Sequence, residues 1–145
     1  MCLIINSRYH EEKLISGRPL ALKAKNDILV YKVLKRGRSN NTFQTPCRNK
    51  HVTFNKKGIA KLSAMFFKFE DNWTISKGIH AITKRGAIRC DLTNSLLEFC
   101  AIIPKGTKFF IGWCNDIVAK KLYIYKDKEI CKKKHPNAKI LNLKD

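Results

Sequence analysis

Two pairs of residues have the types and spacing of a zinc site. Cys47 and His51 are separated by three residues, and so are Cys131 and His135. Together they would supply the four ligands of a tetrahedral Cys2His2 centre. Structural zinc sites more often pair cysteine with cysteine and histidine with histidine, and the lysines around both pairs oppose a cation. We therefore favour surface histidines and partly buried cysteines here, and we expect no metal or other cofactor.

A single histidine, His80, is the best candidate for a catalytic group. It lies between apolar residues, and with Cys100 or Cys114 it would form a thiolate–imidazole pair. The acidic residues are few, and the sequence contains no G-x-S-x-G, P-loop, H-E-x-x-H or G-x-G-x-x-G motif. A strand histidine bonded to the backbone explains His80 more simply. The sequence therefore favours a protein without enzymatic activity.

A tight basic turn in the C-terminal half is a candidate phosphate-binding site. Lys105, Gly106, Thr107 and Lys108 would offer two ammonium groups and successive backbone amides, which hold anions in backbone nests. With His80, this turn would form the phosphate pocket of a nucleotide-binding protein. The other interpretation is a hairpin tip whose lysines only increase solubility, and we favour it.

The charge of the chain is its most informative property. Its 145 residues include 30 Lys and Arg against 11 Asp and Glu, which gives a formal net charge of +19. Such an excess attracts polyanions. Lysine outnumbers arginine by 23 to 7, which suits the neutralisation of phosphates better than the bidentate reading of bases. The expected partner is nucleic acid or another polyanion.

The basic residues form clusters with aromatic residues between them, as in proteins that neutralise phosphates and stack bases. The candidate contacts are Lys35, Arg36, Arg38, Arg48, Lys50, Lys56, Lys57, Lys84, Arg85, Arg89, Lys120, Lys121, Lys132, Lys133 and Lys134. Lys61 belongs to the same cluster as Lys56 and Lys57. Tyr123 and Tyr125 alternate with apolar residues, so they are the best candidates for exposed rings. No helix-turn-helix, zinc-finger or RRM signature is present, which disfavours sequence-specific reading of a duplex.

These candidates must be positioned by a core built mainly from strands. The β-branched and aromatic run over 27–34 predicts a buried strand. Residues 59–69 fit either a helix or a strand, and we lean to a strand. Residues 73–82 predict an extended piece interrupted at Gly78, and 84–95 is a candidate for a short helix.

Three apolar runs in the C-terminal half are separated by turn signals and predict an antiparallel meander. They cover residues 96–103, 108–113 and 119–125. Length and a hydrophobic content of 44% fit a single domain over 1–145. Within it we expect an extended N-terminal arm over 1–26 and a solvated basic tail over 126–145. The predicted fold class is a compact, strand-rich α+β fold.

The chain has no apolar run near the roughly 20 residues that span a bilayer. Its apolar start is short and lacks the basic residues of a secretory signal. The six cysteines show no close pairing of the kind found in disulfide frameworks. We therefore expect a protein with no membrane contact, in the reducing cytoplasm of a bacterial host cell.

Several segments together form a pattern that extends over most of the chain. They are Val30–Leu34, Gly78–Ala81, Ile103–Gly112, Asp116–Ala119 and Lys121–Ile124. With the start Met1-Cys2-Leu3, this pattern resembles a small family of uncharacterised proteins from gut Bacteroidetes and their phages. The segment Ile103-Pro104-Lys105-Gly106 is the distinctive part. The resemblance implies a setting rather than a mechanism.

The leading hypothesis is a non-enzymatic, intracellular protein, associated with a phage or mobile element, that binds nucleic acid through phosphate contacts. One alternative is a nucleotide-ligand protein, either a small enzyme or a sponge for a nucleotide signal. Another is a virion or assembly component with a phage or host protein as partner. The leading hypothesis requires the cationic side chains to gather on one surface.

Overall fold

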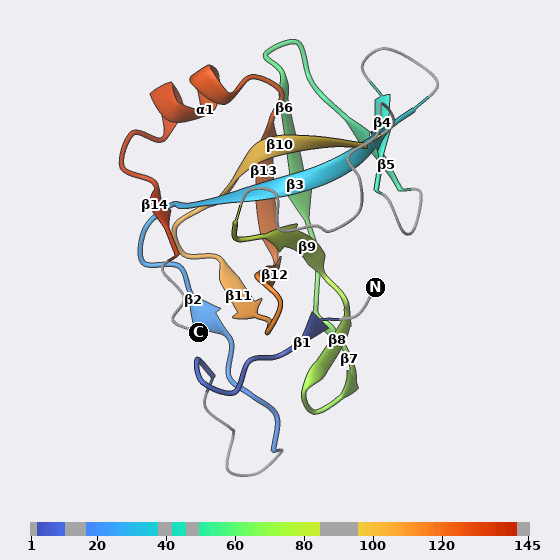
Figure 1. Ribbon diagram of the computed structural model, residues 1–145, viewed down its shortest axis with the longest axis vertical. Coiled ribbons are helices and arrows are strands. Elements are labelled where there is room, and N and C mark those ends of the chain that lie inside the picture. The colour runs from blue at the N-terminus through green and yellow to red at the C-terminus, as the bar shows by residue number, and fades with distance from the viewer. Residues whose placement is uncertain (1–2, 11–16, 38–41, 46–49, 85–95, 142–145) are drawn as a thin grey trace.

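The structure is a computed structural model that describes residues 3–10, 17–37, 42–45, 50–84 and 96–141 (Figure 1). Nearly all regular elements in these ranges are strands, and the helix α1 (Lys128–Lys134) is short. The predicted α+β class is therefore wrong, and the fold is mostly β. The helix expected within 84–95 falls almost wholly outside the described residues. Across the described residues, no helix has the length and apolar character to cross a bilayer.

The strands belong to two sheets. In chain order they are β1 (Leu3–Ile4), β2 (Leu22–Lys23), β3 (Ile28–Arg36), β4 (Thr42–Gln44), β5 (His51–Thr53), β6 (Ile59–Ser63), β7 (Lys68–Asp71), β8 (Thr74–Lys77), β9 (Ile79–Ile82), β10 (Leu96–Ile103), β11 (Lys108–Ile111), β12 (Asp116–Ala119), β13 (Lys121–Tyr125) and β14 (Lys139–Ile140). The large sheet has the order β2-β11-β12-β9-β3-β10-β13-β6, with β4 and β14 also paired to β3 and β5 paired to β4. The small sheet has the order β1-β8-β7.

The strand β3 organises the large sheet. It pairs antiparallel with β10 along its length, from Ile28 opposite Ile103 to Lys35 opposite Leu96. Ile28, Val30 and Leu34 lie in the main core, as the alternation of side chains along a strand requires. The β-branched residues pack well on the pleated surface. The strand predicted over 27–34 is confirmed.

A single residue, Lys120, separates β12 from β13, yet these two strands belong to different parts of the large sheet. The strand β12 pairs with β11 and β9, whereas β13 pairs with β10 and β6. The strand β3 lies between these two parts, because it pairs with both β9 and β10. With β12 and β13 joined through Lys120, the sheet curls around the main core (Figure 1). Val30, Ala101, Ile117 and Leu122 are fully buried inside it.

The predicted C-terminal meander is wrong. In a meander, consecutive strands pair, but β10 pairs with β3 and β13, and β11 pairs with β12 and β2. The third predicted run, 119–125, is the end of β12 followed by β13. The hairpin of β11 and β12 is local, whereas β10 pairs with the distant β3 and not with β11.

The predicted interruption at Gly78 is confirmed, and it is the point where the chain changes sheets. The strand β8 belongs to the small sheet and β9 to the large one. Gly78 has a φ of +157°, and a Cβ built there would lie 2.5 Å from Cγ2 of Val118. Both the backbone conformation and the lack of space require glycine.

Residues in the segment expected as an N-terminal arm contribute to the interior. Leu3 and Ile5 pack in a small cluster with Ile75 and Phe110. His10 is also buried. Its Nε2 accepts a hydrogen bond from the amide of Ile111 at 2.9 Å, so Nδ1 carries the proton and donates to the carbonyl of Leu20 at 2.9 Å. The neutral imidazole thus fixes this segment to the edge of β11.

We expect the free energy of unfolding to decrease as the pH falls below about 6.5. Burial lowers the pKa of His10 from its usual value of 6.5. The imidazole of His10 is therefore protonated at a higher pH in the unfolded chain than in the folded protein. The stabilisation that is present above the pKa of the unfolded state is lost as the pH falls toward the pKa of the folded state. Urea unfolding at about pH 7.5 and about pH 5.5 measures the effect. The variant His10→Gln should show a smaller decrease, and an equal decrease in both proteins would contradict this assignment.

Candidate nucleic-acid interface

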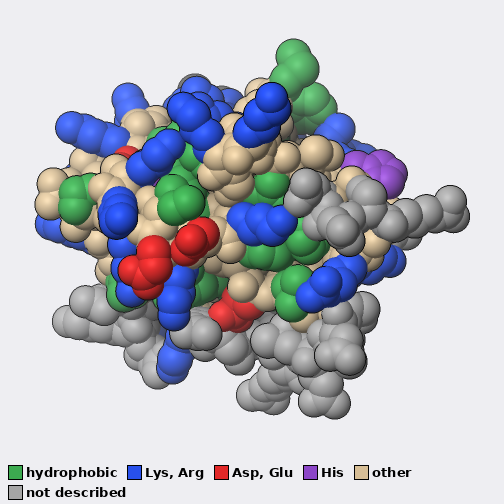
Figure 2. Space-filling model, turned by 90° about the horizontal axis from the view of Figure 1, so that it is seen from above, with side chains coloured by type: hydrophobic (Ala, Val, Ile, Leu, Met, Phe, Trp, Pro, Cys, Tyr) green, Lys and Arg blue, Asp and Glu red, His purple; other side chains and the backbone are tan. Residues whose placement is uncertain are grey.

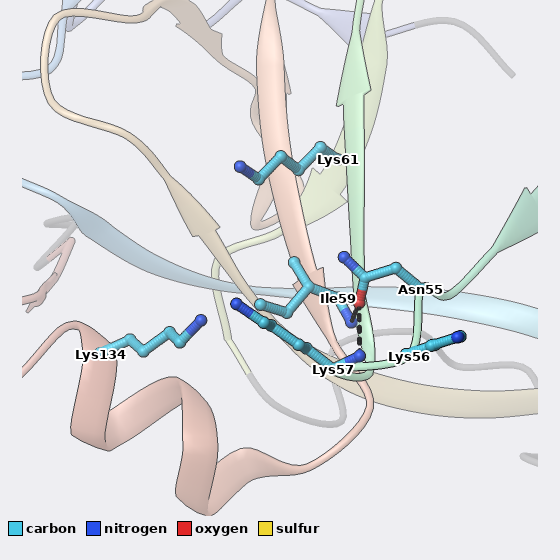
Figure 3. Close-up of a pocket in the computed structure, with 6 residues that line it drawn as sticks. All are labelled: Asn55, Lys56, Lys57, Ile59, Lys61 and Lys134. Atoms are coloured by element: carbon cyan, nitrogen blue, oxygen red, sulfur yellow. Dashed lines mark hydrogen bonds between the residues drawn. The ribbon is translucent and has the colours of Figure 1, made fainter.

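A cleft of about 390 Å³ lies between the turn that precedes β6 and the C-terminal end of α1 (Figure 3). Its lining is basic and consists of Asn55, Lys56, Lys57, Ile59, Lys61 and Lys134. No carboxylate is among these lining residues of the described chain. In Figure 3 the side chains of Lys57 and Lys134 point toward one another, whereas Lys56 points away from them. The cleft therefore concentrates positive charge at one place.

The turn on one side of the cleft is held by the side chain of Asn55. Its Oδ1 accepts hydrogen bonds from the amides of Lys57 at 2.9 Å and Ile59 at 3.0 Å. Gly58 takes the left-handed conformation, with a φ of +76°, and its carbonyl accepts a hydrogen bond from the amide of Lys126. Asn and Gly are the residues that such a turn favours. The backbone that presents Lys57 is therefore fixed in place.

The helix α1 forms the other wall. Asp127 caps its N-terminus by accepting a hydrogen bond from the amide of Glu129 at 2.9 Å. Lysines occupy its last turn, where positive charge is favourable for the helix dipole. Cys131 is buried with Ile59, Ile102 and Tyr125, a group we call the α1 cluster. Burial raises the pKa of the Cys131 thiol to about 11, so the thiol stays neutral and packs as an apolar group.

His135 fastens the end of α1 to two other parts of the chain. Its Nδ1 lies 2.9 Å from Oδ2 of Asp27, and its Nε2 lies 2.5 Å from the hydroxyl of Tyr125. The hydrogen bond from His135 lowers the pKa of Asp27, and burial raises the pKa of Tyr125. Aspartate therefore accepts from Nδ1 and the tyrosine hydroxyl stays protonated. These bonds keep the neighbouring Lys134 at the cleft.

The two histidines of the Cys-x3-His pairs lie in different places. Both ring nitrogens of His135 are within hydrogen-bond distance of other side chains, and Cys131 packs in the α1 cluster. His51 is on β5, which is joined through β4 to the opposite end of β3 from α1 (Figure 1). Cys47 lies outside the described residues. Within the described ranges, no three His, Cys, Asp or Glu side chains gather as metal ligands do.

The amides of the basic turn at 105–107 already have acceptors within the protein. The amide of Lys105 donates to Oδ1 of Asp27 at 2.9 Å. The amide of Gly106 donates to the carbonyl of Ala24 at 2.7 Å, and the amide of Thr107 donates within the turn. Lys105 and Lys108 are exposed. A phosphate at this turn would have to compete with these bonds and with a nearby carboxylate.

His80 and the two cysteines considered with it come from separate strands and turns. His80 is on β9, opposite Val118 of β12, and its carbonyl accepts a hydrogen bond from Nζ of Lys32 at 2.5 Å. Cys100 is on β10, and β3 lies between β9 and β10. Cys114 is exposed in the turn between β11 and β12. His80 is thus a strand residue of the large sheet, and neither Cys100 nor Cys114 lies on a strand next to β9.

The other predicted basic contacts lie on several parts of the surface. Lys35 and Arg36 end β3, Lys50 precedes β5, Lys84 follows β9, Lys120 lies between β12 and β13, Lys121 begins β13, and Lys132 and Lys133 are on α1. Arg38, Arg48, Arg85 and Arg89 lie outside the described residues. Figure 2 shows Lys and Arg side chains scattered over one face, with hydrophobic and acidic groups between them. The described basic side chains therefore do not gather on one large surface, as the leading hypothesis required. The lysines that line the cleft form a smaller, local group.

The two tyrosines predicted as exposed rings have different environments. Tyr125 is only 3% exposed, because α1 covers that side of β13. Tyr123 is half-buried, and Nζ of Lys61 lies 5.2 Å from the centroid of its ring. The exposure predicted for Tyr125 is therefore not observed, and Tyr123 remains the candidate next to the cleft.

The predicted contacts Lys56, Lys57 and Lys134 all line the cleft. Sequence reasoning placed Lys61 only in a basic cluster and did not select Asn55 or Ile59. The residues Asn55-Lys56-Lys57-Gly58 are typical of a turn, but the opposite wall of the cleft comes from a distant part of the chain.

No family model, curated protein or solved structure matches this chain. The resemblance to proteins of gut Bacteroidetes and their phages therefore stays a prediction. Fold and site define the protein as a basic, mostly β domain with a lysine-lined cleft.

Proposed function

We propose that this protein binds nucleic acid through backbone phosphates at the cleft between the β6 turn and α1. The observation that carries the proposal is that Lys56, Lys57, Lys61 and Lys134 line one open space without an acidic group in the described lining. Ammonium groups bind phosphate oxygens as point charges and need no particular base. The net charge of +19 adds long-range attraction for a polyanion.

The form of the cleft favours a polymer over a small nucleotide. The cleft is open to solvent, whereas small-ligand pockets bury most of the ligand. The alternative pocket near His80 and Lys105 has less support, because the amides there donate to protein acceptors.

The cellular compartment and the association with a phage are also part of the proposal. The described cysteines Cys114 and Cys131 are free thiols, which fits a reducing compartment. Binding without catalysis, in the cytoplasm of a bacterial host cell and in association with a phage, is the expected mode of action.

A salt titration tests the proposal. A labelled single-stranded oligonucleotide is bound at increasing salt, and affinity is followed by fluorescence anisotropy. If four phosphates are neutralised, the slope of log affinity against log salt should be about −3, a loss of roughly 50-fold between about 50 and about 200 mM salt. A flat response would refute the proposal. Polyglutamate of equal charge is the control, and equal affinity for it would indicate an acidic protein partner instead.

A further inference from the structure

Tyr123 connects the lysine cleft with the surface of β13. It lies directly opposite Lys61 in the pairing of β13 with β6, and Lys61 lines the cleft. The ring packs at the edge of the α1 cluster, which limits its rotation. An aromatic ring of defined orientation therefore lies next to the place where phosphate would bind.

Lys61 has two competing partners in a complex. In the free protein its ammonium lies over the ring of Tyr123, in a cation–π contact. A phosphate in the cleft carries a full negative charge, which attracts the ammonium more strongly than the ring does. The lysine side chain is flexible, so its head group turns to the phosphate. That movement uncovers the face of the ring.

We infer that the cleft takes single-stranded nucleic acid, with one base stacked on Tyr123 beside a phosphate held by Lys61. The inference rests on the proposed function and specifies that the bound nucleic acid is single-stranded. Stacking on a protein ring needs a base that has left its neighbours, which a single strand presents and a duplex does not. Tyr125 takes no part, because it is buried and bonded to His135.

The experiment compares two oligonucleotides of equal length and equal phosphate number, oligo-dT and its abasic counterpart. The native protein should bind oligo-dT about tenfold more tightly, as stacking of one base predicts. The variant Tyr123→Leu should bind both equally, at the affinity of the native protein for the abasic strand. The variant Tyr123→Phe keeps the ring and should retain the tenfold ratio. Thermal unfolding of each variant confirms that the fold is intact.

The outcomes separate this inference from the proposed function. Equal affinity of the native protein for both strands would overturn stacking while leaving phosphate binding in place. A ratio that persists in Tyr123→Leu, or a duplex that binds as tightly as oligo-dT, would overturn it as well. Failure to bind either strand would instead overturn the proposed function. The variant Lys61→Met should weaken both complexes by the same factor, because it removes a phosphate contact and keeps the ring.

Discussion

Replacing Lys57, Lys61 and Lys134 together with glutamine is expected to weaken the binding of a single-stranded oligonucleotide about 100-fold at low salt. Each substitution removes one charge-assisted contact of on the order of 1 kcal/mol, and 1.4 kcal/mol corresponds to a factor of ten. The slope of log affinity against log salt should also decrease in magnitude by about 2, because three fewer counterions are released. Fluorescence anisotropy over a range of salt concentrations measures both changes.

The matched control changes the same number of charges at residues that do not line the cleft. Lys35 is next to the last residue of β3, Lys50 precedes β5 and Lys84 follows β9. Their combined replacement with glutamine lowers the net charge by the same amount, so it measures the effect of the overall charge alone. We expect the affinity for the oligonucleotide to fall about threefold in this control. Equal losses in the two triple variants would mean that binding is diffuse and that the cleft has no special role.

The substitution Gly78→Ala is expected to lower the free energy of unfolding by about 3 kcal/mol. An added Cβ would lie 2.5 Å from Cγ2 of Val118 and 3.1 Å from Phe67, at a φ of +157°. Backbone strain and overpacking each cost roughly 1–3 kcal/mol. Because Gly78 joins the two sheets, the surroundings cannot move without disturbing β8 or β9. Urea unfolding followed by circular dichroism measures the change.

Gly106→Ala separates the two causes. Gly106 has a φ of +88°, but a Cβ there meets no atom within 4 Å. Its replacement should therefore cost only the backbone term, about 1 kcal/mol. If Gly78→Ala costs no more than Gly106→Ala, the contact with Val118 contributes nothing to the requirement for glycine.

Local patterns predicted the strands better than their partners. The β-branched run of β3 and the break at Gly78 are properties of neighbouring residues, and both are confirmed. The alternation over 119–125 could not show that Lys120 divides it between two parts of the sheet. The composition of residues 126–145 predicts a basic tail, whereas the structure has the short helix α1 there, with Asp127 and Glu129 at its start.

The sequence predicted some residues of the candidate site but not which of them lie together. The charge of Lys56, Lys57 and Lys134 makes them candidates, whereas the cleft that they line exists only because α1 packs against the sheet. The same packing explains why Tyr125 is buried while Tyr123 is not. Nothing in the alternation of β13 indicates that a later segment covers one of its tyrosines.

The order of the two walls along the chain has a consequence for the nascent protein. The turn at Asn55–Gly58 precedes most of the sheet, whereas α1 follows nearly all of it. During translation, the early lysines leave the ribosome long before the helix exists. His135 can fasten α1 only when Asp27 and Tyr125 have already been brought together. The complete lysine-lined cleft therefore forms only when folding is almost finished.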